Sequence, residues 1–238
     1  MSPHTNGGSA RDPYEDARVF LQPIAAPSIL GLFGFAGATF IVAAHAANWY
    51  GTTNSPEYLF PFAAMFGGLA QFLAGMWAYR ARDGVATAMH GMWGSFWLAY
   101  GILNLLAATG AIVLPTGKFP ELGYWFLALG VITALGAFAA AAESISLFTV
   151  LTSLAAGSGF LAIHYLTGTG WWETAGGWIL VGSAIAATYT AGAMMIEGAW
   201  GRVVLPLGKL AKDPNIPGRR VTRPVEYEFA EPGVRQGQ

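Results

Sequence analysis

The chain has 238 residues, of which 54% are hydrophobic and only 11% charged, and its mean hydropathy is +0.46. A soluble domain carries about 25% charged residues. This composition excludes a disordered chain, a coiled coil and a nucleic-acid-binding protein with a basic surface. The formal net charge of -1 averages two polar ends with an apolar middle, residues 27–197, which holds six acidic and three basic residues. The sequence predicts an all-α polytopic membrane protein.

Six apolar stretches are each long enough to cross a hydrocarbon core, which takes roughly 20 residues. Turn-forming residues separate them, and the fourth and fifth are close enough to form a tight hairpin. We expect a transmembrane domain over 27–208, a polar N-terminal segment over 1–26 and a Pro- and charge-rich tail over 209–238. The expected spans are Ser28–Asn48, Tyr58–Tyr79, Ala88–Val113, Leu122–Ala142, Ser146–Thr167 and Ala175–Ile196.

Lys and Arg are distributed unevenly between the two sides of such a bundle. With six spans, eleven of the twelve lie on the side of the two termini, and Lys118 lies alone on the other side. Cytoplasmic loops of membrane proteins carry an excess of Lys and Arg. We therefore expect both termini in the cytoplasm and the protein in the cell membrane.

The spans lack the groups that other membrane functions need. No Lys or Arg lies inside a span, and the nearby acidic residues sit at predicted ends, so no carboxylate marks the mid-membrane site of an ion-driven pump. Cys is absent, and no catalytic or metal-binding motif is present. We expect no enzyme activity, no cofactor and no metal.

Uncharged polar residues and histidines are scattered through the spans. A polar side chain in lipid needs either a partner on a neighbouring helix or a hydrated path. As a set with many aromatic residues and no charge, these residues predict a transporter or channel for a small polar solute. The histidines are interpreted as packed, pore-lining or pH-sensing residues rather than haem ligands: His45, His90 and His164.

Four blocks of sequence form a recognisable pattern: Pro-Ser-Ile-Leu-Gly-Leu-Phe-Gly-Phe at 27–35, Phe-Gly-Gly-Leu-Ala-Gln-Phe-Leu-Ala-Gly at 66–75, Gly-Ser-Phe-Trp-Leu at 94–98 and Gly-Arg-Val-Val-Leu-Pro-Leu-Gly at 201–208. In this order they resemble the acetate uptake transporter family, which includes bacterial succinate–acetate permeases and yeast acetate/ammonia export proteins. Ala26 stands where the family signature has Asn. The motif residues are Pro27, Leu30, Gly31, Leu32, Gly67, Gly68, Gly75, Gly201, Arg202, Leu205, Pro206 and Gly208.

The resemblance implies six transmembrane helices around a central path, similar to urea-channel architecture, and a homohexamer. The implied substrates are acetate and related short carboxylates such as succinate, moved with or as their protons. The family narrows its path with a Phe, a Tyr and a Leu, which correspond here to Phe35, Trp93 and Leu154. His90, where the permeases carry an apolar aromatic residue, lies three residues before Trp93 on the same helix face and would tie flux to pH. The other expected path residues are Thr39, Gln71, Ser95 and Tyr189.

Two alternative functions stay open. The same bundle would suit a channel for urea, short amides or ammonia, and it would also suit a non-transporting membrane sensor or scaffold subunit whose tail is the working part. The permeating form is open as well. One form is the anion, which would be hydrated on both sides of a short water-free section of the path. The other is the neutral acid, about 0.2% of the total at pH 7 for a pKa of about 4.3.

Overall fold

The computed structural model describes residues 19–21, 24–210 and 225–227. Its contacts divide the chain into two units, Met1–Ile24 with Val221–Gln238, and Ala25–Arg220. In the first unit β1 (Val19–Leu21) pairs antiparallel with β2 (Val225–Tyr227). The second unit contains all the described helices. Most of the expected polar segment 1–26 and tail 209–238 lies outside the described residues, so their roles stay predictions.

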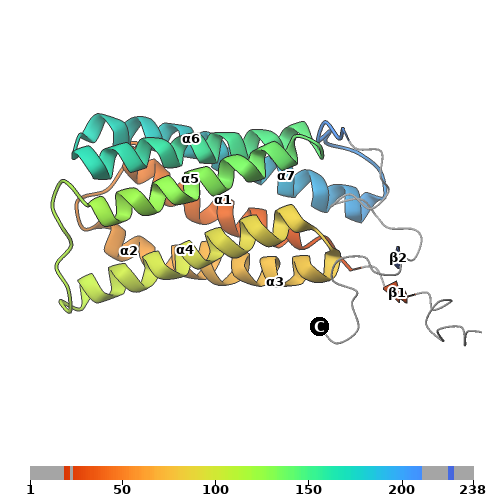
Figure 1. Cartoon of the computed structure of the whole chain (residues 1–238), viewed down its shortest axis with the longest axis horizontal. Helices are drawn as coiled ribbons and strands as arrows, with labels where there is room; N and C mark the ends of the chain where they lie inside the picture. The colour runs from red at the N-terminus through yellow and green to blue at the C-terminus, as the bar shows by residue number, and fades with distance from the viewer. Residues whose placement is uncertain (1–18, 22–23, 211–224, 228–238) are drawn as a thin grey trace, which may run out of the picture. The chain divides into compact units, whose positions relative to one another are not determined.

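The second unit is a helical bundle whose long helices run side by side along one axis (Figure 1). Because α2, η1 and α3 follow one another without a break, the bundle has six long helical runs, and the all-α prediction is confirmed. Five of the six are long and apolar enough to cross a membrane, and α4, with 25 residues, is long enough but less apolar. The elements are α1 (Pro27–Ala46), α2 (Ser55–Phe62), η1 (Ala63–Ala70), α3 (Gln71–Ala81), α4 (Gly84–Ala108), α5 (Pro120–Ala140), α6 (Ile145–Thr167) and α7 (Gly170–Trp200).

Local sequence accounts for where the helices begin and end. Proline stands in the first turn of α1, α2 and α5, where its missing N–H costs nothing. Asp83 caps α4 by accepting from the Ala86 amide at 2.8 Å, and Ser144 caps α6. Gly168 and Gly201 end α6 and α7 in the left-handed conformation that favours glycine. These signals set the positions at which the helices begin and end.

The largest differences between expected and observed boundaries are at the end of the third span and the start of the sixth. The third span was expected to reach Val113, but α4 ends at Ala108 because Gly110 turns the chain with a φ of +72°. The sixth was expected to begin at Ala175, but α7 begins at Gly170. Its first turn carries Glu173, which the helix dipole stabilises there.

The second helical run contains a π-helix that the sequence analysis did not predict. Eight residues, Ala63–Ala70, hydrogen-bond in π-helical fashion between α2 and α3. Pro61 lies just before them and lacks an amide hydrogen, and Gly67 and Gly68 lie within them. Such segments are rare and frequently occur at functional sites. Gln71 is the first residue after this segment, so the π-helix sets the direction in which its side chain points.

Close backbone approach between α3 and α4 depends on Gly75. A Cβ at Gly75 would lie 2.6 Å from the backbone nitrogen of Gly91, whereas a Cβ at Gly91 would meet open space. Small residues at such crossings let helices pack tightly in a membrane. The family motif glycine is therefore a packing residue at this position.

We expect Gly75→Ala to lower the thermal stability of the detergent-purified protein, because the backbone of α4 would have to move. Overpacking of this kind costs about 1–3 kcal/mol. Gly91→Ala is the matched control and should be neutral or slightly stabilising, since alanine is the better helix former. Equal unfolding temperatures for the two variants would contradict this account of the crossing.

Candidate functional site

Two cavities enter the bundle from opposite ends and share two lining residues, Trp93 and Leu154. The first cavity opens where α4 begins and α5 turns into α6, and its empty space is about 690 Å³ when the open solvent at its mouth is included. The second opens where α1 ends and α7 begins, and its empty space on the same basis is about 720 Å³. A route through the bundle would therefore pass the side chains that separate these cavities.

The three residues that the sequence analysis expects to form a constriction line these cavities. Phe35 on α1 lines the first cavity, while Trp93 on α4 and Leu154 on α6 line both. None of the three is more than 3% exposed, and all belong to one buried cluster. The Trp93 Nε1–H donates to Thr133 Oγ1 at 2.9 Å, which fixes the indole. We call these three residues the apolar partition.

Gln71 and His90 supply polar atoms to the first cavity. Their exposed fractions are 2% and 5%, and both line this cavity. Gln71 Oε1 and His90 Nδ1 are fully buried and have no hydrogen-bond partner among the described residues. The His90 ring packs against the family-motif residue Gly31. A Cβ added at Gly31 would lie 2.5 Å from Cε1 of the His90 ring.

The other expected path residues separate into two groups. Thr39 lines the second cavity, and its buried hydroxyl has no partner among the described residues. Ser95 and Tyr189 line neither cavity and are exposed on the outside of the chain. Ser95 donates to the Gly91 carbonyl, and Tyr189 donates to the Pro206 carbonyl. We leave both out of the path.

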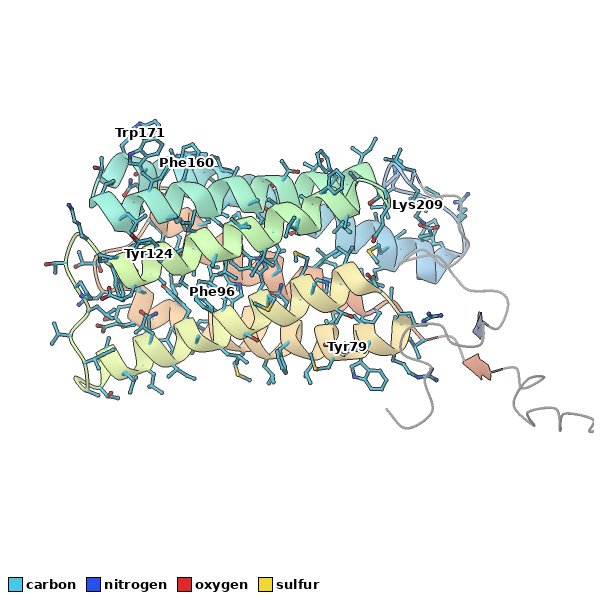
Figure 2. All side chains as sticks on the ribbon, in the orientation of Figure 1. Tyr79, Phe96, Tyr124, Phe160, Trp171 and Lys209 are labelled. Atoms are coloured by element: carbon cyan, nitrogen blue, oxygen red, sulfur yellow. The ribbon has the colours of Figure 1, made fainter. Side chains whose placement is uncertain are left out.

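Charged residues surround the mouth of the first cavity, and the sequence analysis did not group them. Asp83 comes from the start of α4, Glu143 from the α5–α6 turn and Lys209 from beyond α7. Lys209 Nζ donates to the carboxylate oxygens of Glu197 at 2.8 and 2.7 Å, and Figure 2 shows Lys209 at this end of the bundle. Asp83 was recognisable as a helix cap. The convergence of Asp83, Glu143 and Lys209 from distant segments on one cavity was not.

The two carboxyl groups at this mouth lie outside the spans and have raised pKa values. Burial raises the pKa of Asp83, although hydrogen bonds from the Ala86 and Val85 amides oppose the rise. Burial, and then the neighbouring charge of Asp83, raises the pKa of Glu143 to about 7. The charge at this mouth therefore changes in the physiological pH range.

We expect Glu143→Gln to increase stability above neutral pH. The raised pKa means that the folded protein binds this proton more tightly than the unfolded chain does, so wild-type stability falls as pH rises from about 4.5 to about 7. The variant should gain about 1 kcal/mol over wild type at about pH 8, after allowing for solvent screening, and little at about pH 5. Thermal unfolding at both pH values measures this. An equal gain at both, or an equal response of the exposed control Glu121→Gln, would contradict it.

The C-terminal family motif packs against the α5–α6 turn and lines part of the first cavity. The Ile145 and Ser146 amides donate to the carbonyls of Gly208 and Leu207, and the Leu210 amide donates to the carbonyl of Glu143. Leu207 also lines the first cavity. The segment Gly201–Leu210, which we call the docked segment, therefore binds the α5–α6 turn through backbone hydrogen bonds.

Aromatic side chains form a large part of the lining of the second cavity. Phe96 lies between α4 and α5 (Figure 2), and Phe126 stacks on Tyr165 with ring centroids 5.7 Å apart. His45 and Glu173 lie at its mouth, and the His45 ring is hydrogen-bonded to the Tyr50 carbonyl at 3.1 Å. Among residues 19–21, 24–210 and 225–227 no group of three or more His, Asp or Glu side chains is placed to hold a metal ion.

Comparison with known proteins gives consistent matches. A family model described as GPR1/FUN34/yaaH family matches residues 11–212. The succinate-acetate/proton symporter SatP of Escherichia coli K12 is 27% identical over 186 residues, 78% of this chain and 96% of that protein. Ammonia transport outward protein 2 of Saccharomyces cerevisiae is 32% identical over 85 residues, 36% of this chain and 30% of that protein. The solved structure of the bacterial acetate channel SatP matches with a TM-score of 0.72 at 27% identity, covering 78% of this chain and 100% of that one.

Proposed function

Because the chain belongs to the GPR1/FUN34/yaaH family, we propose that it carries acetate and related short carboxylates such as succinate across a membrane, as a transporter or channel. The observation that carries the proposal is the pair of cavities that enter from opposite ends and meet at Trp93 and Leu154. The names of the SatP relative and of the matching structure, which cover most of this chain, support the substrate class.

The apolar partition accounts for selection without fixed charge. Phe35, Trp93 and Leu154 offer a narrow, buried and uncharged passage, in which a solute is sorted by its size and by the cost of removing its water. Desolvation of a charged group is far costlier than that of a neutral one. Small acids that pass as neutral molecules, or that stay hydrated on both sides of the partition, are therefore favoured.

Uptake of labelled acetate into proteoliposomes tests the proposal. We expect saturable uptake above protein-free vesicles that unlabelled succinate reduces. Competition by urea or ammonium, with no effect of succinate, would favour the amide or ammonia alternative instead. Deletion of Lys212–Gln238 tests the sensor alternative, because a transporter keeps its uptake without the tail.

The family and the long apolar helices make the chain a multi-pass membrane protein. We place both termini, and with them the mouth of the first cavity, in the cytoplasm of the cell, because eleven of the twelve Lys and Arg residues lie on that side. The chain has no Cys, so single cysteines report topology cleanly. Thr116→Cys should react with an impermeant thiol reagent in intact cells, and Ala142→Cys only after permeabilisation. The reverse pattern would invert the orientation.

Large apolar side chains cover the outside of the bundle, including Leu135 and Phe138 on α5 and Trp77 on α3. These surfaces need lipid or other copies of the chain. Following the resemblance to hexameric members, we propose that six copies assemble. Native mass spectrometry from mild detergent should show the hexamer, and a monomer alone would contradict it.

A further inference from the structure

The first cavity contains two buried polar atoms that no described residue satisfies. Gln71 Oε1 comes from the end of the π-helical run and His90 Nδ1 from α4, and both side chains line the cavity. A buried polar atom without a partner costs about 1–3 kcal/mol, and such atoms in a native protein need an explanation. A ligand that supplies the missing hydrogen bonds would explain both atoms.

The two atoms require different hydrogen-bond partners, one a donor and the other an acceptor. Gln71 Oε1 can only accept a hydrogen bond, whereas His90 Nδ1 donates when it carries the proton of the neutral ring. A neutral carboxyl group offers both partners on one carbon, an O–H that donates and a C=O that accepts. A carboxylate has no proton to donate, so it leaves the Gln71 oxygen without a hydrogen bond.

The charges lining the cavity also disfavour an anion. Of the described lining residues, Asp83 and Glu143 are acidic and Lys209 is basic. The Lys209 ammonium is already bonded to both carboxylate oxygens of Glu197. Apolar side chains, among them Leu32 and Met89, make up most of the remaining wall. An acid without its proton would be dehydrated by a mostly apolar cavity whose lining ammonium, Lys209, is already paired.

We propose that Gln71 and His90 form a two-point subsite for the neutral carboxyl group of a short acid, in which the acid donates to Gln71 and accepts from His90. The inference rests on the proposed function and adds which form of the substrate the cavity takes. Each molecule that crosses then carries its own proton. No carboxylate inside the membrane is needed to link proton movement to acid movement.

Binding measured against pH tests the subsite. The full-length protein in detergent is titrated with acetate at about pH 5.5, 6.5 and 7.5, with sodium chloride as the ionic control, and thermal stabilisation gives the apparent Kd. If only the neutral acid binds, the Kd rises about tenfold for each pH unit above the pKa of the acid. A Kd that stays constant or falls as pH rises would overturn the inference.

Acetamide provides a second ligand with the same pattern of hydrogen bonds. Its N–H donates and its C=O accepts, but it does not lose a proton in this range. Its Kd should therefore stay constant with pH. A failure of acetamide to bind would overturn the two-point geometry.

Variants show whether the pH dependence of binding comes from the proton of the acid or from a proton on the protein. His90→Phe and Gln71→Leu should weaken acetate binding about tenfold, the loss of roughly 1.4 kcal/mol. His90→Gln keeps a donor and should retain part of the affinity. Ser95→Ala, on the outside of α4, is the matched control and should leave the Kd unchanged. If His90→Phe abolishes the pH slope, the titrating group is the histidine and the inference fails.

Labelled-acetate uptake by the wild type keeps the two proposals distinguishable. Uptake together with a flat pH profile of binding overturns the subsite and leaves the transport function standing. Absence of both uptake and binding overturns the transport function itself. The thermal transition of each variant without acetate reports whether it is folded.

Discussion

Replacing Trp93 with alanine is expected to join the two cavities and to raise the flux of succinate relative to acetate. Trp93 is 3% exposed and lines both cavities, so its indole is the largest side chain in the apolar partition. One methylene of pocket size discriminates substrates by about 10–200-fold. Loss of the whole indole should therefore change the succinate-to-acetate ratio by about tenfold or more. Competitive uptake of the two labelled acids in proteoliposomes measures it.

Trp97→Ala is the matched control for this experiment. Trp97 lies one turn further along α4, is buried to a similar degree and lines the second cavity alone. Both substitutions should cost about 3–5 kcal/mol of stability through the void that they leave. Only Trp93→Ala removes part of the partition. If the two variants change the substrate ratio equally, Trp93 does not control passage.

Replacing Lys209 with methionine is expected to destabilise the protein and release the docked segment. Lys209 and Glu197 are mostly buried, with 20% and 11% of their side chains exposed. Glu197 lies in the last turn of α7, where the helix dipole disfavours a carboxylate. Breaking a buried pair costs about 3–5 kcal/mol, and the partial exposure here reduces this to about 2 kcal/mol. Thermal unfolding in detergent measures the loss.

A double variant shows whether the cost belongs to the ion pair. Lys209→Met with Glu197→Gln leaves no unpaired buried charge, so most of the stability should return. Arg202→Met removes a cation that lies over the exposed Trp200 ring at 5.5 Å and should cost less than 1 kcal/mol. A Lys209→Met variant as stable as Arg202→Met would contradict the role of the pair.

Helical periodicity accounts for several outcomes on α4. His90 and Trp97 lie three before and four after Trp93, so they share its face and line the cavities. Ser95 lies two residues after Trp93, roughly 200° around the helix, and faces outward. The same rule that predicted His90 as a path residue would have excluded Ser95.

Other features needed contacts between distant segments. Tyr189 looked like a donor for the path, but its hydroxyl reaches Pro206 in the docked segment. Asp83, Glu143 and Lys209 appeared as unrelated loop residues and meet at one cavity mouth. The π-helix had only weak local signals in Pro61 and the Gly67–Gly68 pair. None of these follows from the order of residues alone.

The sequence by itself determined that the chain is a helical membrane protein, the approximate position of each span and the low charge of the interior. These properties are sums over neighbouring residues, because hydropathy and length decide whether a segment can lie in lipid. The tertiary structure decided which side chains converge on the cavities. That depends on the rotation and register of each helix, which are set by contacts such as the approach of Gly75 to Gly91 and of Gly31 to His90.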